Sequence, residues 1–313
     1  MTDTEARPGR LRLWLREIRA PFLVASAVPV IVGSAAAFAA TGIFHPWLAA
    51  LALVGTVLLH AGANVANDFF DHRSGNDAAN HNLTPFSGGS RVIQEGLLTP
   101  TQVITGAVVL WAAGAAAGVT LAILLKSAFI LALMLAGLLG GCLYTAPPVR
   151  LGYRGLGELT IAVLFGVLPA VGAFVVQTGA FEAWTLAPGA VQGLLVALVL
   201  FVNEFPDEEA DRAAGKRTLV VLLGRERAAR LWLVLLPATW VAAGLATWLL
   251  PPMRAAGVPF VATAPLMVFT LRFAAVELPR PSGRHLANFL TLVLFVIAGL
   301  SLAAGFVISG LNR

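Results

Sequence analysis

Apolar residues in this chain are gathered into long continuous runs, separated by shorter polar segments. A run of about 20 predominantly apolar residues is long enough to cross the roughly 30 Å hydrocarbon core of a bilayer as a helix. Lipid offers no partners for backbone N–H and C=O groups, and the runs do not alternate with polar residues, so we expect helices and not barrel strands. Nine runs are predicted to span a membrane, near residues 21–41, 47–66, 103–123, 127–146, 157–178, 186–205, 231–250, 257–276 and 287–310.

The composition excludes a soluble globular protein. Of the 313 residues, 58% are hydrophobic and only 12% are charged, and the mean hydropathy is +0.84. A soluble protein of this length would have far more apolar side chains than its cores could bury. We therefore predict an all-α, polytopic membrane protein whose helices contact membrane lipid.

The lysines and arginines segregate to one side of the predicted spans. Of the 21 such residues, only Lys126, Arg254 and Arg313 fall on the other side. The positive-inside rule then places the N-terminus and the long loops in the cytoplasm, as in a plasma membrane protein. The net charge of +5 follows from this topology and gives no indication of nucleic acid binding. The 18 cations on the predicted cytoplasmic side are Arg7, Arg10, Arg12, Arg16, Arg19, Arg73, Arg91, Arg150, Arg154, Arg212, Lys216, Arg217, Arg225, Arg227, Arg230, Arg272, Arg280 and Arg284.

Residues 1–20 are predicted to form a cytoplasmic N-terminal segment, followed by one transmembrane domain over residues 21–313. The sequence LRLWLREIRAPF, residues 11–22, alternates apolar and basic positions at helical spacing, which favours a short helix lying on the lipid headgroups. The first apolar run is too long for the core of a signal peptide, so we expect an uncleaved first helix. The single cysteine, Cys142, excludes an intrachain disulfide and a cysteine-built metal site.

Two polar motifs interrupt the apolar pattern at the ends of the second and sixth predicted spans. In NVANDFFDHRSGND, residues 64–77, the positions Asn64, Asn67, Asp68 and Asp71 share one face of a helix. In NEFPDEEADRAAGKRT, residues 203–218, Asn203, Asp207 and Asp211 form a second stripe at a spacing of four residues. Glu208 and Glu209 fall off that face and are predicted to be solvated.

The two motifs repeat each other. The Asn-x-x-x-Asp pattern recurs from 67 to 203 and from 71 to 207, an offset of 136 residues in both cases. An even number of crossings separates the second and sixth spans, so both motifs should emerge on the same side of the membrane. This predicts two four-helix pseudo-repeats plus one helix, closed around a central cavity with the motifs at its mouth.

Facing carboxylates repel each other unless cations lie between them, and hard oxygen ligands favour Mg²⁺ shared with substrate phosphates. The motifs therefore predict a site for Mg²⁺ and a diphosphate. The candidate metal ligands are Asn64, Asn67, Asp68, Asp71, Asp77, Asn203, Asp207 and Asp211. Asn67 and Asn203, together with the cations Arg91, Arg150, Arg154, Lys216 and Arg217, are candidates for binding the diphosphate, although topology alone also explains these cations. Tyr144 is expected to line the cavity.

These motifs, the run YTAPPVRLGYRGLGE from Tyr144 to Glu158, and GKRTL after Asp211 resemble the UbiA superfamily of intramembrane aromatic prenyltransferases. Within it, NDFFDHRSGND is most similar to the MenA-type branch, which prenylates 1,4-dihydroxy-2-naphthoate for menaquinone. Many members have N-x3-D-x3-D in the first motif, whereas this chain has Gly75 at the last position and Asp77 two residues later, which leaves the role of Asp77 less defined.

The resemblance implies Mg²⁺-dependent transfer of a polyprenyl group from an allylic diphosphate to an aromatic acceptor, with Asp71, Asp207 and Asp211 as catalytic residues. Homogentisate, 4-hydroxybenzoate, a glyceryl phosphate and haem stay open as acceptors, and neither the prenyl length nor the oligomeric state is indicated. A secondary transporter is the alternative of another class, but its ionisable groups should lie near mid-membrane, where this chain has almost none. A lipid phosphotransferase of the CDP-alcohol type would need a D-G-x2-A-R run, which this sequence lacks.

Overall fold

The computed structural model describes residues 9–280 and 285–312 and confirms an all-α bundle, with no β-strand in these ranges. The first eight residues of the predicted N-terminal segment, and Arg284 and Arg313 of the cation count, lie outside the described residues. The helices are α1 (Arg10–Glu17), α2 (Val24–Thr41), α3 (Pro46–Ser74), α4 (Asn76–Ala79), α5 (Pro100–Leu124), α6 (Ala128–Thr145), α7 (Gly157–Ala162), α8 (Leu168–Thr178), α9 (Leu186–Ala213), α10 (Leu219–Leu223), α11 (Arg225–Leu249), α12 (Arg254–Val261), α13 (Ala264–Glu277) and α14 (Leu286–Leu311).

The predicted spans agree with the long apolar helices. In the described ranges, eight helices are long and apolar enough to cross a membrane, and the pair α12 and α13 makes a ninth span if it is counted as one. This pair is bent by 55°, where we had predicted one span over residues 257–276. The fifth span is continuous from α7 to α8 through a wider π-helical turn at Val163–Val167.

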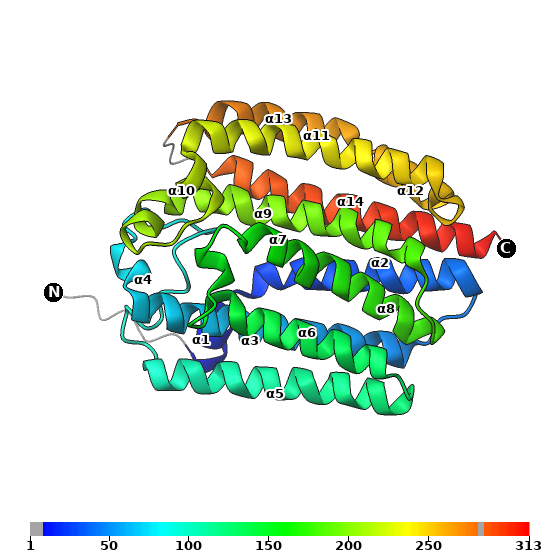
Figure 1. Ribbon diagram of the computed structural model, residues 1–313, viewed down its shortest axis with the longest axis horizontal. Helices are drawn as coiled ribbons and strands as arrows, with labels where there is room; N and C mark the ends of the chain where they lie inside the picture. The colour runs from blue at the N-terminus through cyan, green and yellow to red at the C-terminus, as the bar shows by residue number, and fades with distance from the viewer. Residues whose placement is uncertain (1–8, 281–284, 313) are drawn as a thin grey trace.

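Most of the long helices lie side by side along the long axis of the molecule, with α5 at one edge and α11 and α13 at the other (Figure 1). The short helices α4 and α10 lie at one end of the bundle, which we call the polar end. The helices α3 and α9 extend beyond the predicted spans toward this end, to Ser74 and Ala213. These extensions carry the two polar motifs.

Small residues let the central helices approach closely. A Cβ atom on Gly33 of α2 would lie 2.0 Å from the backbone oxygen of Ala170 on α8. A Cβ atom on Gly166 would lie 2.2 Å from Gly193 on α9. Close backbone approach at small residues is the usual means of packing helices in lipid, where no hydrophobic effect drives association. These contacts fix the walls around the inner cavities.

The predicted interfacial helix is present as α1, but its inward face is more polar than the sequence suggested. Leu11 is 76% exposed, whereas the ring of Trp14 packs over Gly106 of α5. Glu17 is fully buried and accepts a hydrogen bond from Ser90. The helix is therefore held against the bundle by specific contacts, in addition to any contact with lipid headgroups.

Candidate functional site

A polar cavity lies at the polar end of the bundle, between α3, α6 and α9. The helices α3 and α9 contribute Asn67, Asp71, Asn203, Asp207 and Asp211 to its wall. The segments that follow these helices complete it, with Asn76, Asp77, Asn80 and Lys216. The two motifs that the sequence paired by their offset are thus brought together around one cavity.

Asp71 is held by side chains from three segments. The Tyr153 hydroxyl donates to Asp71 Oδ1 at 2.6 Å, and Asn67 Nδ2 donates to Asp71 Oδ2 at 3.3 Å. Lys216 Nζ lies 3.6 Å from Asp71 Oδ2. Helix α3 ends at Ser74, three residues after Asp71, and is followed by Gly75, which caps it with a φ of 79°. This backbone conformation would strain any residue with a side chain. The chain can therefore turn back over the cavity directly after the first motif.

Residues after α3 cross-link the first motif to the second. Asn76 Nδ2 donates to Asp211 Oδ1 at 2.9 Å, and Asn80 Nδ2 donates to Asp207 Oδ1 at 2.6 Å. These asparagines were not predicted as site residues, because the helical periodicity of the motif ends at Ser74. Asn203 has a different partner, Asn288 of α14, whose Nδ2 donates to Asn203 Oδ1 at 2.8 Å.

Lys216 provides the positive charge between the motifs. Its Nζ lies 3.5 Å from Asp211 Oδ1 in addition to the contact with Asp71. Burial alone would lower the pKa of Lys216, but the carboxylates of Asp211 and Asp71 outweigh burial and raise this pKa well above its usual value. The ammonium group therefore stays charged at neutral pH and compensates both aspartates.

Arg19 is a site residue that sequence reasoning did not identify, because it was counted only among the topological cations. Its guanidinium forms an ion pair with Asp68, and Nη2 donates to Asn67 Oδ1 at 3.3 Å. The side chain lines the polar cavity. Asp68 also accepts a hydrogen bond from the backbone N–H of Ser90 at 2.8 Å. Arg19 thus adds a second cation to the cavity wall.

Asp77 is buried beneath the loop that follows α4. Gln94 Nε2 donates to its Oδ2 at 2.9 Å, and Arg91 Nη1 donates to its backbone oxygen at 2.6 Å. Burial, followed by the negative charges of Asp71 and Asp68, raises the pKa of Asp77 to about 7. The loop approaches closely at Gly89, where φ is 70° and a Cβ atom would lie 3.1 Å from Asp77 Oδ1.

Several predicted residues have partners other than the cavity. Asn64 Nδ2 donates to the backbone oxygen of Ile18 at 3.0 Å, although Asn64 still lines the wall. Arg150 lies over the ring of Tyr153, and Arg154 donates to the Pro148 carbonyl. Of the five cations that we proposed for the diphosphate, Lys216 alone is among the cavity-lining residues, whereas Arg91, Arg150, Arg154 and Arg217 are not. Tyr144 lines the cavity as predicted.

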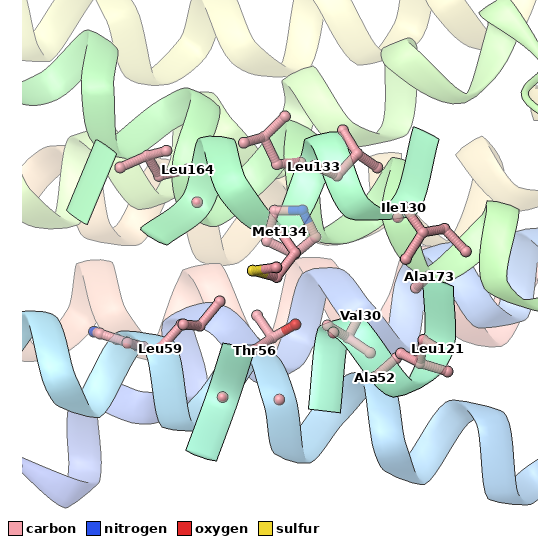
Figure 2. A pocket seen from close by; sticks show the side chains of 18 of the residues that line it. Val30, Ala52, Thr56, Leu59, Leu121, Ile130, Leu133, Met134, Leu164 and Ala173 are labelled. Carbon is pink, nitrogen blue, oxygen red and sulfur yellow. The ribbon is translucent and has the colours of Figure 1, made fainter. Parts of the chain in front are cut away.

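A second cavity, lined mostly by apolar side chains, continues from the polar one into the bundle. Figure 2 shows Leu133, Met134 and Leu164 on one side of it and Thr56 and Leu59 on the other. The walls come from α2, α3, α5, α6 and α8. The two cavities meet where five residues line both of them, namely His60, Ala63, Gly141, Leu164 and Phe165. A polar site thus opens directly onto an apolar chamber within the predicted membrane region.

The chain matches a known protein family over most of its length. A model described as the UbiA prenyltransferase family matches residues 26–297, most of the 313-residue chain. The chain belongs to the UbiA prenyltransferase family. It is 32% identical to the 1,4-dihydroxy-2-naphthoate octaprenyltransferase of Escherichia coli, over 94% of this chain and 97% of that protein. It is 28% identical to the 2-carboxy-1,4-naphthoquinone phytyltransferase of Synechocystis, over 97% of this chain and 96% of that protein.

Solved structures show the same fold. A UbiA homolog from Archaeoglobus fulgidus, bound to GPP and Mg²⁺, superposes with a TM-score of 0.63 at 18% identity, over 93% of this chain and 99% of that one. The apo structure of a UbiA homolog from Aeropyrum pernix gives 0.65 at 17% identity, over 90% and 97%. This UbiA-family chain is accordingly an integral membrane protein and a membrane-bound prenyltransferase.

The donor set of this UbiA-family site fits Mg²⁺ by its chemistry, because it consists of carboxylate and amide oxygens. In the described part of the chain, however, no group of three or more His, Cys, Asp or Glu side chains is arranged to hold a metal ion. Instead, the Lys216 ammonium lies between Asp71 and Asp211. A cation therefore already occupies the position between the two motifs, and the eight predicted metal ligands remain a prediction.

Proposed function

We propose that this UbiA-family prenyltransferase transfers a polyprenyl group from an allylic diphosphate to 1,4-dihydroxy-2-naphthoate in menaquinone biosynthesis. The observation that carries the proposal is the pair of joined cavities, one lined by aspartates, Lys216 and Arg19 and the other by apolar side chains. A substrate with a charged head and a long apolar tail fits this pair. The named naphthoate prenyltransferases that resemble the chain over most of its length support the choice of acceptor.

The aspartates of both motifs, with Asn67 and Asn203, would hold Mg²⁺ at the diphosphate. Bound there, the ion would neutralise the diphosphate oxygens and stabilise the leaving group. Lys216 and Arg19 line the same cavity and would donate charge-assisted hydrogen bonds to these oxygens. Negative charge that develops as the carbon–oxygen bond breaks would therefore meet fixed cations, the arrangement that lowers such barriers most effectively.

The apolar cavity would hold the prenyl tail and keep water from the allylic cation. Its junction with the polar cavity is lined by His60 and Phe165, whose rings lie 4.3 Å apart. His60 Nδ1 is held by the Ser26 hydroxyl at 3.1 Å. A ring carbon of the acceptor would attack the allylic carbon here, diphosphate would leave with the bonding electrons, and loss of CO2 from the alkylated carbon would restore the aromatic ring. Exclusion of water favours this path over hydrolysis.

The distribution of cations supports an orientation with the polar end in the cytoplasm of a plasma membrane protein. A cysteine introduced at Leu83, which is 54% exposed, in a chain whose Cys142 is replaced by alanine, should react with a membrane-impermeant maleimide only after the cells are opened. Labelling in intact cells would contradict this orientation.

The proposed reaction is tested with purified protein, Mg²⁺, prenyl diphosphates of several lengths and a panel of acceptors, with the products identified by mass. We expect a decarboxylated prenyl naphthoquinol, loss of activity in excess EDTA, and no product from Asp71→Ala or Asp207→Ala protein that is still folded in detergent. Product from homogentisate, 4-hydroxybenzoate, a glyceryl phosphate or haem in place of the naphthoate would overturn the proposed acceptor. Full activity in EDTA would overturn the metal requirement.

A further inference from the structure

Two glutamates lie together at the inner side of the polar cavity and have no role in the site described above. Glu204 on α9 directly follows Asn203, and Glu158 lies at the start of α7. The two carboxyl groups are close enough to interact directly, although the structure contains no well-formed hydrogen bond between them in its described part. Both side chains are deeply buried, Glu204 at 6% exposed and Glu158 at 9%. Glu204 lines the polar cavity.

Each of these carboxyl groups has an oxygen without a hydrogen-bond partner. Glu204 Oε2 and Glu158 Oε1 are buried, and neither is paired with any other group in the described part of the chain. Buried polar atoms are nearly always paired in native proteins, so an unpaired oxygen on each of two neighbouring carboxyl groups points to a missing donor. The nearby ammonium of Lys216 is already engaged by Asp71 and Asp211.

The place of Glu204 on its helix defines what that donor would belong to. Glu204, Asp207 and Asp211 are spaced i, i+3 and i+7, so they share one face of α9, with Glu204 about one turn deeper in the bundle. The aspartates face the proposed diphosphate, and the apolar cavity begins below. Glu204 lines the same polar cavity as Phe165, which belongs to the junction with the apolar cavity. A ligand that spans these two residues would lie where the head of the proposed prenyl diphosphate meets its tail, which is where an acceptor must attack.

The surroundings of Glu204 favour a flat aromatic ligand. The cavity wall around it is formed by the rings of Tyr144 and Phe165 and by aliphatic side chains such as Leu164 and Leu200. Aromatic rings pack well against such walls. The ligand must combine a ring with a hydrogen-bond donor, which is the chemistry of a phenol.

We propose that the Glu204 and Glu158 carboxyl pair binds a ring hydroxyl of the aromatic acceptor and thereby selects hydroxylated acceptors. This inference rests on the proposed function, because it requires an aromatic acceptor. The hydroxyl donates to Glu204 Oε2 and the ring lies beside Tyr144 and Phe165. A site built to hydrogen-bond a hydroxyl rejects analogues that lack it, because its buried acceptor is then left unpaired.

The test compares Glu204→Gln and Glu158→Gln with Glu209→Gln, a control on the exposed face of α9. Kinetic constants are measured separately for the acceptor and for the prenyl diphosphate. We expect Glu204→Gln to raise the acceptor KM about tenfold or more, because the amide replaces one acceptor oxygen of the carboxyl group by an NH2 donor, which cannot pair with the hydroxyl hydrogen. The KM for prenyl diphosphate should change less than about threefold in Glu204→Gln, and so should all kinetic constants in Glu209→Gln. A threefold change is well below the roughly tenfold change expected for the acceptor KM, so the two results can be told apart.

A second measurement separates binding of the hydroxyl from a general structural role. Acceptors with and without one ring hydroxyl are compared in the wild type and in Glu204→Gln. We expect the wild type to prefer the hydroxylated acceptor by about tenfold or more, and the variant to lose most of that preference. Equal losses for both acceptors, or an unchanged acceptor KM, would overturn the inference.

The outcomes distinguish this inference from the proposed function. If the wild type prenylates another phenol but no naphthoate, the proposed acceptor fails, and the same comparison on that phenol and its O-methyl ether decides the role of Glu204. If the wild type shows no preference for a ring hydroxyl in any acceptor, the inference fails while the prenyltransferase activity stands. This last comparison uses only the wild type, so it can overturn the inference even if a glutamate variant does not fold.

Discussion

Replacement of Lys216 by methionine should destabilise the protein in the absence of Mg²⁺. The side chain keeps its length but loses the charge that lies 3.6 Å from Asp71 and 3.5 Å from Asp211. At these separations each attraction is worth roughly 4–5 kcal/mol at an effective dielectric constant of about 20, before the cost of burial. Removal of one partner from a buried ionic cluster costs roughly 3–5 kcal/mol, because the remaining charges are uncompensated.

The assay is thermal unfolding in detergent, in EDTA and over a titration of Mg²⁺. A loss of roughly 3–5 kcal/mol corresponds to a fall of roughly 6–20 °C in Tm, at about 2–4 °C per kcal/mol. Lys126, the one other lysine, lies in the turn between α5 and α6 and supplies the control Lys126→Met. We expect Mg²⁺ to restore much of the loss in Lys216→Met, since the ion would replace the missing cation. Equal Tm values for the two variants in EDTA would refute the reasoning.

Three further variants follow from the structure. Tyr153→Phe removes the 2.6 Å hydrogen bond to Asp71 and should cost roughly 1–3 kcal/mol of stability and lower kcat, both relative to wild type. Burial, and then the charge of Asp68, raises the pKa of Glu17 from 4.5 to about 7. The folded state thus binds this proton more tightly than the unfolded state, and the free energy of unfolding falls as the pH rises from about 4.5 to about 7. Glu17→Gln should therefore be more stable than wild type by on the order of 3 kcal/mol at pH 8 but not at pH 4. Gly33→Ala would meet the backbone of α8 at 2.0 Å, whereas Gly137→Ala meets nothing closer than 3.9 Å; we expect the first to lose roughly 1–3 kcal/mol or to fail to fold, and the second to unfold near the wild-type Tm.

The helical part of the fold could be predicted because the bilayer imposes it. A segment that must pair its own backbone in lipid and cross about 30 Å leaves a long apolar run in the sequence. The bend between α12 and α13 is marked only by Thr263 and by two prolines, Pro259 within α12 and Pro265 in the first turn of α13. Proline also lies inside α2, α9 and α11, which continue through it. Whether a proline breaks an apolar run therefore depends on packing against other helices, which periodicity does not report.

The aspartates of the site could be predicted because their spacing follows the period of a helix. Asp71, Asp207 and Asp211 lie on helices α3 and α9 that continue past the membrane spans, so the pattern and the structure share one geometry. The groups that hold these aspartates come from segments with no period. Tyr153, Asn76 and Asn80 reach the aspartates from short segments between the long helices, and their contacts depend on how those segments fold back.

For the arginines, the same sequence signal, a cation at the polar end, has two causes. The positive-inside rule and the binding of a diphosphate both place cations at the polar end, so the sequence could not separate them. The structure separates them by position, because Arg19 lines the cavity and Arg154 donates to a backbone carbonyl outside it.

The sequence pattern does not mark Glu204 for a related reason, since a stripe at a spacing of four residues runs from Asn203 to Asp207 and leaves out the three residues between them, Glu204 among these. The i, i+3 and i+7 positions of Glu204, Asp207 and Asp211 form an equally regular face, but the meaning of that face depends on what lies opposite. In the structure, Glu158, which lies 46 residues earlier in the chain, is close to Glu204, and each of the two carboxyl groups has a buried oxygen without a hydrogen-bond partner. The spacing of residues along a helix therefore identifies the charged groups that face the proposed diphosphate. The group that we propose to bind the acceptor is identified by its buried oxygens without hydrogen-bond partners, which only the three-dimensional structure shows.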